Sequence, residues 1–245
     1  MGSDAGHMSS AVGDAGEDRS SGPSGWRSRV ASLEAAAVAG IVCAIGWSVG
    51  LGGLLSIPSL SASDAEIVRY YRQPNAGENA LLLLQIVVVA SIAFLWFVGV
   101  VRGRLGADEP RLVGTVFLGG SVLLAGIMFV GTAALAAPSV LLAVGGRFPD
   151  PGAASMARAF AATVLAVFGP RVTALVMIST ASLGRTTGAL PRWLVALSYL
   201  LGVIELVNVT LSQPSLYVFP AWLALVSVVL LIRRPRRSLE PEVSG

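Results

Sequence analysis

The chain contains no lysine, one cysteine and one histidine among its 245 residues, and only 13% of its residues are charged. A soluble domain carries about 25% charged residues, so this deficit argues against a soluble enzyme. It also argues against a disordered chain, which would combine low hydrophobicity with a high net charge. Apolar residues make up 54% of the sequence, and the mean hydropathy is +0.75. The composition therefore predicts an integral membrane protein.

The scarcity of cysteine and histidine excludes most familiar catalytic and metal centres. Cys43 lies inside an apolar run, so no disulfide can form within the chain. His7 lies in a polar N-terminal stretch. The chain therefore lacks the histidine and cysteine residues that a zinc centre, a Ser–His pair or a haem-binding site requires. We expect no catalytic residue, no metal and no cofactor, and we expect the protein not to be an enzyme.

The basic residues are all arginines, 17 in number, and the net charge is +3. A nucleic-acid-binding face would gather many more basic residues on one solvated surface. Here the arginines stand in short stretches between apolar runs, which is typical of membrane flanks. We therefore expect lipids and not nucleic acid as partners. Arginine without lysine, together with abundant alanine, glycine and valine, indicates GC-rich coding, which we interpret as an actinobacterial origin.

Six apolar runs are long enough, or nearly so, to cross the roughly 30 Å hydrocarbon core of a bilayer. Because backbone groups cannot stay unpaired in hydrocarbon, each run is predicted to be a helix. The sequence thus predicts an all-α, polytopic six-helix bundle over residues 34–233, between a disordered tail 1–33 and a tail 234–245. Five spans is the alternative, with the last two runs merged or one only dipping into the membrane. The six runs are about 35–57, 80–101, 112–137, 155–183, 193–212 and 216–232.

The arginines also predict how the chain is oriented. Twelve fall on one side of the predicted helices and four on the other, while Arg171 falls within a span. By the positive-inside rule the side with twelve is cytoplasmic. We therefore predict a multi-pass protein of the bacterial plasma membrane with both termini in the cytoplasm. The four outer arginines are Arg69, Arg72, Arg147 and Arg158.

Two outer connections carry helix-start signals. Ser63 and Glu66 have the spacing of a capping box, and apolar residues and tyrosines follow them. This pattern predicts a short amphipathic helix at the outer interface, serving either as a lid over a pore or only as a connector. Asp150 followed by Pro151 predicts the start of the fourth long helix.

The fourth and fifth runs hold the only charged residues well inside the predicted membrane. Arg171 and Glu205 lie roughly 18 and 21 Å from the inner loop, so adjacent antiparallel helices would place them at one level. Charges in hydrocarbon are costly, which predicts a contact between the two, directly or through one water. Two interpretations stay open: a buried pair that fixes the helix arrangement, or a site for a small ligand, an ion or a proton.

Other polar residues lie at a similar predicted depth. Pro170 cannot donate a backbone hydrogen bond, so a helix kink and a freed carbonyl group are expected there. Asn208 lies one turn beyond Glu205, and Gln85 lies in the second run. Together with Arg171, these residues predict a polar pocket in the outer half of the bundle.

Small residues mark a helix-packing face on the first run. Gly46 and Gly50 form a G-x-x-x-G motif, and Gly53 extends the same face. Such faces let two helix backbones approach closely. The face predicts packing within the bundle, with homodimerisation as the alternative.

Three short motifs carry a family resemblance: the segment 66–71 with its two tyrosines, the sequence Leu-Pro-Arg-Trp-Leu at 190–194, and the pair Arg233–Arg234. The chain resembles, over roughly 34–237, a broad group of uncharacterised six-helix integral membrane proteins from actinobacteria. The resemblance implies six helices in a bacterial plasma membrane, and it transfers no functional residue.

The sequence leaves two functions open. One is a membrane protein that binds or moves a small ligand or lipid through the polar pocket. The other is a structural or regulatory subunit that acts through partner membrane helices, as a homo-oligomer or with another protein. The chain is less similar to an ABC-type permease, because the connection at about 213–215 is too short for the outer hairpin of such proteins.

Overall fold

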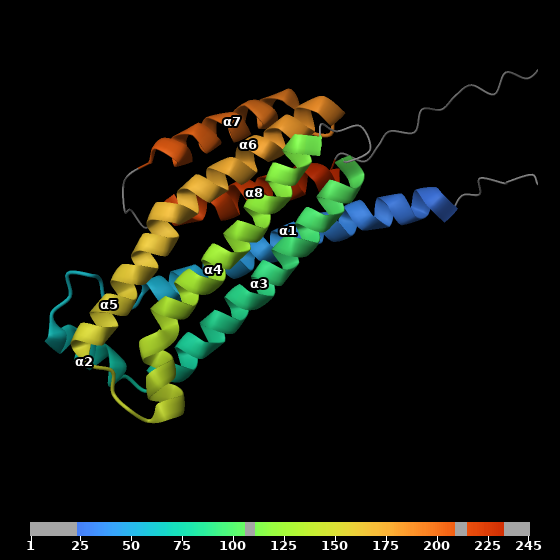
Figure 1. Cartoon of the computed structure of the whole chain (residues 1–245). Coiled ribbons are helices and arrows are strands. Elements are labelled where there is room, and N and C mark those ends of the chain that lie inside the picture. Colours follow the sequence, from blue (N-terminus) through green and yellow to red (C-terminus); the bar gives the residue numbers. More distant parts are fainter. Residues whose placement is uncertain (1–23, 106–110, 209–214, 233–245) are drawn as a thin grey trace, which may run out of the picture.

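The computed structural model describes residues 24–105, 111–208 and 215–232, and every regular element in them is a helix. The predicted all-α class is therefore confirmed for this part of the chain. Most of the helices are long and run lengthwise through one elongated bundle (Figure 1). The elements are α1 (Ser24–Leu55), α2 (Asp64–Tyr71), α3 (Ala76–Leu105), α4 (Arg111–Gly145), α5 (Pro151–Ala162), the π-helix η1 (Thr163–Phe168), α6 (Gly169–Thr187), α7 (Arg192–Val207) and α8 (Ser215–Ile232).

Within the described residues, five stretches are long and apolar enough to cross a membrane, which makes this a multi-pass membrane protein by length and composition. The fourth is continuous through α5, η1 and α6. Helix α7 is not among the five, because its 16 residues extend only about 24 Å. The five stretches are Glu34–Leu55, Ala76–Arg102, Leu112–Gly145, Pro151–Thr187 and Ser215–Ile232.

Several predicted boundaries differ from the structure. Helix α1 begins at Ser24, so residues 24–33, which the sequence placed in the disordered tail, are helical. Helix α4 continues through Pro138 to Gly145, eight residues beyond the predicted end of the third run. Helix α7 ends at Val207, where Asn208 takes an extended backbone conformation. The rest of the predicted tail 1–33, and residues 234–245, lie outside the described residues.

The two helix starts predicted at Ser63 and at Asp150 are confirmed. The backbone N–H of Ser63 donates to Glu66 Oε2 at 2.8 Å, and the backbone N–H of Glu66 donates to Ser63 Oγ at 3.4 Å. These hydrogen bonds lower the pKa of the Glu66 carboxyl. Asp150 caps α5 by accepting a hydrogen bond from the backbone N–H of Ala153 at 3.0 Å. Helix α2 does not stand free, because its buried face packs on α5.

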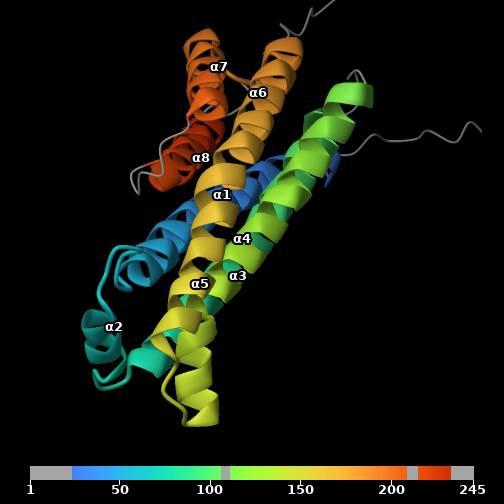
Figure 2. The same cartoon turned by 60° about the vertical axis from the view of Figure 1, so that its left-hand side comes forward.

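The long helices pack side by side around one apolar core. Helix α1 lies between α3 and α8, α4 packs on α3 and α6, and α7 packs along α6 (Figures 1 and 2). Two buried tryptophans join helices through their indole N–H groups: Trp47 donates to Ser91 Oγ at 3.0 Å, and Trp222 donates to Ser198 Oγ at 2.8 Å. The second bond ties α8 to α7.

The glycine face of α1 packs against α3. A Cβ atom at Gly46 would lie 2.6 Å from the Cβ of Ala90, and one at Gly53 would lie 2.5 Å from the side chain of Leu83. A Cβ at Gly50 would clash with Val87. The three glycines thus allow two helix backbones within this bundle to approach closely.

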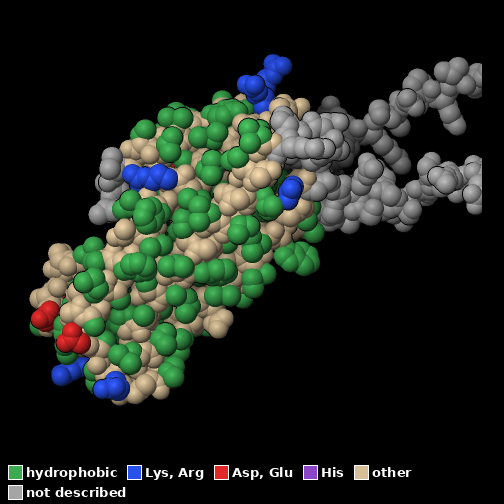
Figure 3. Space-filling model, viewed as in Figure 1, with side chains coloured by type: hydrophobic (Ala, Val, Ile, Leu, Met, Phe, Trp, Pro, Cys, Tyr) green, Lys and Arg blue, Asp and Glu red, His purple; other side chains and the backbone are tan. Residues whose placement is uncertain are grey.

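Apolar side chains are spread along the whole length of the face seen in Figure 3, as expected for a surface in contact with lipid tails. Acidic side chains appear on this face at the end of the bundle that carries α2. We refer to this end, formed by α2 and the adjoining ends of α1, α4 and α5, as the α2 end.

Candidate functional site

Arg171 and Glu205 lie near each other but are not joined directly. The guanidinium Nη1 of Arg171 donates to the backbone carbonyl of Val167 at 2.6 Å. Its charge lies within electrostatic range of the Glu205 carboxylate, yet no hydrogen bond or ion pair joins these two described side chains. The predicted direct contact is therefore absent, and a contact through one water stays a prediction.

The irregularity expected at Pro170 takes the form of a π-helix that ends two residues before it. The backbone N–H of Gly169 donates to the carbonyl of Val164, five residues earlier. Proline has no N–H to continue the regular ladder, and a π segment leaves carbonyl groups without their usual partners. Arg171 satisfies one of these carbonyl groups, that of Val167, with its own side chain.

Glu205 lines a small cavity at the level of the π-helix. The side chain is 2% exposed. The cavity has a volume of about 20 Å³, enough for roughly one water molecule. Its other walls include Trp47, Leu165, Pro170, Thr173, Leu216 and Phe219.

The other predicted members of the polar pocket do not line this cavity. Gln85 lies on an exposed face of α3, and Asn208 follows the last residue of α7. Arg171 is half-buried, with its guanidinium turned to its own helix. The structure thus brings Glu205 and Pro170 together in one cavity and leaves the other three outside its walls.

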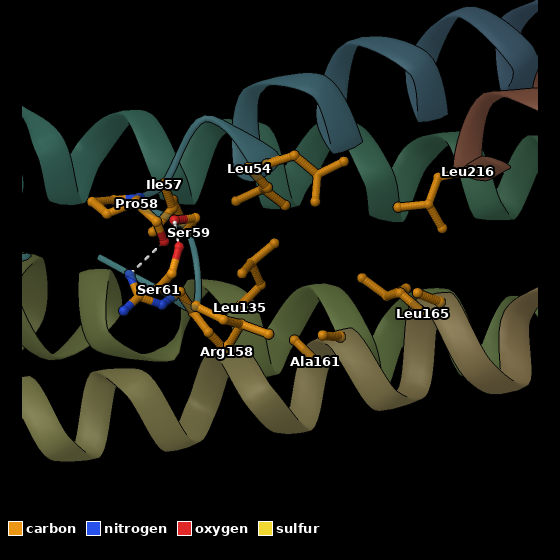
Figure 4. A pocket seen from close by; sticks show the side chains of 14 residues that line it. Leu54, Ile57, Pro58, Ser59, Ser61, Leu135, Arg158, Ala161, Leu165 and Leu216 are labelled. Carbon is orange, nitrogen blue, oxygen red and sulfur yellow. Dashed lines mark hydrogen bonds between the residues drawn. The ribbon is translucent and has the colours of Figure 1, made fainter. Parts of the chain in front are cut away.

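A larger cavity lies at the α2 end. It has a volume of about 340 Å³ and separates the end of α1 from α5 and η1 (Figure 4). Most of its wall is apolar, and we call it the leucine cavity. The residues that line it are Leu54, Leu55, Ile57, Pro58, Ser59, Leu60, Ser61, Leu135, Arg158, Ala161, Ala162, Leu165, Ala166 and Leu216.

Among the described residues that line the leucine cavity, Arg158 alone is charged, and it is only 3% exposed. Its Nη1 donates to the backbone carbonyl of Pro58 at 2.6 Å, as Figure 4 shows, and its Nη2 donates to Ser155 Oγ at 3.4 Å. The Nε atom is buried and has no hydrogen-bond partner in the described part of the chain. The site therefore has one unused cationic donor.

Two further buried hydroxyl groups, those of Tyr71 and Ser139, lie near each other at the α2 end. Tyr71 of α2 and Ser139 of α4 carry hydroxyl oxygens that form no hydrogen bond among the described residues. The two side chains lie next to each other, and Tyr71 is within electrostatic range of Arg158. Burial raises the pKa of the Tyr71 phenol, and the positive charge of Arg158 offsets part of that rise. The two hydroxyl groups are close enough to interact with each other, and neither residue lines the leucine cavity.

The sequence contained a signal for this site that the counting of flanking arginines missed. Ala154, Arg158, Ala161 and Leu165 are spaced at i, i+4, i+7 and i+11, which places Arg158 on the buried face of its helix. An arginine within an apolar stripe indicates a buried charge and not a solvated flank.

A second, more polar hollow of about 240 Å³ lies between α2 and the segment after α1. It is lined by Glu66, Arg69, Tyr70 and Gln73 of α2 or its C-terminal end, and it shares Pro58 and Ser59 with the leucine cavity. The two spaces therefore meet at one short stretch of backbone, the stretch that Arg158 holds.

Among the described residues, no group of three or more histidine, cysteine or acidic side chains is placed to hold a metal ion. The expectations about metals, cofactors and catalysis remain expectations from the composition. Comparisons with known proteins found no family model, no curated protein and no solved structure that matches this chain.

Proposed function

We propose that this protein is a six-span protein of a bacterial plasma membrane that binds the hydrocarbon chain of a lipid-like molecule in its leucine cavity. The observation that carries the proposal is the cavity itself, about 340 Å³ in volume with a wall made largely of leucine and alanine. Ligand pockets commonly have volumes of about 300–1,000 Å³ and mostly apolar walls. A hydrocarbon chain fills such a space and removes apolar surface from water at about 25 cal/mol per Å².

The proposed topology places the leucine cavity in the outer half of the membrane. The twelve arginines on one side of the helices, against four on the other, support cytoplasmic termini. The α2 end then faces outwards, where an outer-leaflet lipid has access to the cavity. For six spans, α7 and the residues after it must complete the fifth crossing, which the packing of α7 along α6 favours.

A reporter fused after Arg237 tests this topology. With six spans the reporter lies in the cytoplasm, whereas with five spans and α7 on the inner side it lies outside. A matched fusion within residues 106–110 should give a cytoplasmic signal in both cases and serves as the control. An external signal at the C-terminus contradicts the six-span arrangement.

A cavity-filling pair of variants tests chain binding. Ala161 lies in the wall of the leucine cavity and is 1% exposed, whereas Ala159, two residues earlier on the same helix, is exposed. We expect Ala161→Phe to abolish binding of a fluorescent fatty-acid analogue to the purified protein, because the ring occupies the space of the chain. Ala159→Phe makes the same change on the opposite face and should bind like the wild type. Saturable binding that Ala161→Phe leaves unchanged, or no binding by the wild type, contradicts the proposal.

A further inference from the structure

We propose that the leucine cavity selects chains with an anionic head group and that Arg158 binds the oxygen atoms of that head. The inference rests on the proposed chain binding and adds the class of ligand. The head could be the carboxylate of a fatty acid or the phosphate of a phospholipid, which share negatively charged oxygens attached to hydrocarbon.

The first argument is the incomplete pairing of a buried charge. Arg158 is 3% exposed, and its two hydrogen bonds, to the Pro58 carbonyl and the Ser155 hydroxyl, are both to neutral oxygens. No carboxylate of the described residues forms an ion pair with it. Burying a guanidinium is costly unless an opposite charge compensates it. A bound anion supplies that compensation.

The second argument is the position of the charge within the cavity. Arg158 lies at the end lined by Pro58, Ser59 and Ser61, while Leu165 and Leu216 line the far part (Figure 4). Leu165 is seven residues beyond Arg158 on one helical run, a distance of about 10 Å along the axis. The cavity thus has a charged, hydroxyl-bearing end and a long apolar end, which is the polarity of an anionic amphipathic molecule.

The third argument is an unused donor on Arg158 itself. The Nε atom is buried without a hydrogen-bond partner in the described residues. A buried donor of this kind calls for a partner, which the described side chains do not supply. One ordered water could accept this hydrogen bond, but water does not neutralise the guanidinium charge. An anionic oxygen accepts the hydrogen bond and also compensates the charge, and charge-assisted hydrogen bonds to a guanidinium are the stronger kind.

The test compares ligands that differ only in the head. Oleate and oleyl alcohol share one chain, and dioleoyl phosphatidic acid and dioleoylglycerol share another. Each is used to displace the fluorescent fatty-acid analogue from the purified full-length chain in an uncharged detergent. We expect the anionic member of at least one pair to bind about tenfold more tightly, the fold-change that one charge-assisted hydrogen bond provides. The pair with the larger preference identifies the head as carboxylate or phosphate.

Matched variants assign the preference to Arg158. Arg158→Met keeps a long apolar side chain but removes the charge, so we expect the ratio between its affinities for oleate and for oleyl alcohol to fall to about one. Arg69→Met removes an exposed arginine of α2 and should keep the preference. If Arg158→Met does not fold, Arg158→Lys serves in its place, with a reduced preference expected because lysine lacks the planar fork of donors.

The outcomes separate this inference from the proposed function. If the wild type binds both members of each pair equally, chain binding stands and the selection of anions is wrong. A full preference in both Arg158 variants also overturns the inference. If no member of either pair binds, the proposed function itself fails, and the inference fails with it. Inorganic phosphate alone should displace the analogue weakly or not at all, since it lacks the chain.

Discussion

The close approach of α1 and α3 predicts that Gly46→Ala destabilises the bundle. A Cβ at position 46 would lie 2.6 Å from the Cβ of Ala90, and carbon atoms pack best at about 3.5–4.0 Å. Neither methyl group can rotate away, because each is fixed to its backbone. The two helices must therefore separate by about 1 Å, with an overpacking cost of about 1–3 kcal/mol.

A matched glycine makes the measurement interpretable. Gly126 lies in the interior of α4, and a Cβ there would meet no atom within 4 Å. Gly126→Ala should therefore stabilise the protein by about 0.5–1 kcal/mol, the usual gain from replacing glycine in a helix. Thermal unfolding in detergent, followed by tryptophan fluorescence, should place the two variants on opposite sides of the wild type. A Gly46→Ala variant at least as stable as the wild type refutes the close packing of α1 on α3.

Three further predictions concern the polar residues. The effects of Arg171→Met and Glu205→Gln on thermal stability should be less than additive by about 0.5 kcal/mol, since the two charges are within electrostatic range but not in direct contact; strictly additive effects would show that they are independent. Tyr71→Phe removes a buried hydroxyl without a partner, so it should raise the stability of the ligand-free protein by about 1 kcal/mol, and a large loss would reveal a hidden partner. The capping hydrogen bonds hold the pKa of Glu66 below its ordinary value, so they stabilise α2 fully at pH values above that ordinary pKa, and this stabilisation is lost as the pH falls through the lowered pKa. Amide hydrogen exchange in α2 should therefore become faster at acidic pH. Glu66→Gln should remove this pH dependence.

The features that could be predicted from the sequence are those set by neighbouring residues or by composition. The helix starts at Ser63 and Asp150 follow from side chains that cap backbone groups three residues away. The membrane-crossing helices follow from the length of apolar runs, because each must satisfy its own backbone hydrogen bonds. Pro138 did not end α4, since the helix continues through it to Gly145.

The polar pocket was harder to predict because residue counting gives depth along a helix and not direction around it. Glu205 turns into the core, whereas Gln85, at a similar predicted depth, is exposed. The guanidinium of Arg171 donates to the backbone carbonyl of Val167, which belongs to the π-helix. Residue spacing does not reveal that a π-helix forms at this point. Arg158 was counted as an outer flank because it lies at the very start of the predicted run 155–183. Its place on the buried stripe of α5 is what makes it part of a cavity.

Photo-crosslinking tests the central claim, that a hydrocarbon chain occupies the leucine cavity, most directly. A fatty acid with a photoreactive group near the end of its chain is bound to the protein in nanodiscs and activated, and the labelled peptides are mapped by mass spectrometry. We predict labelling of the cavity wall at Leu135, Leu165 or Leu216, and loss of that labelling in Ala161→Phe. Labelling confined to exposed residues such as Leu82 and Val89 on the outer surface of α3 would contradict the claim.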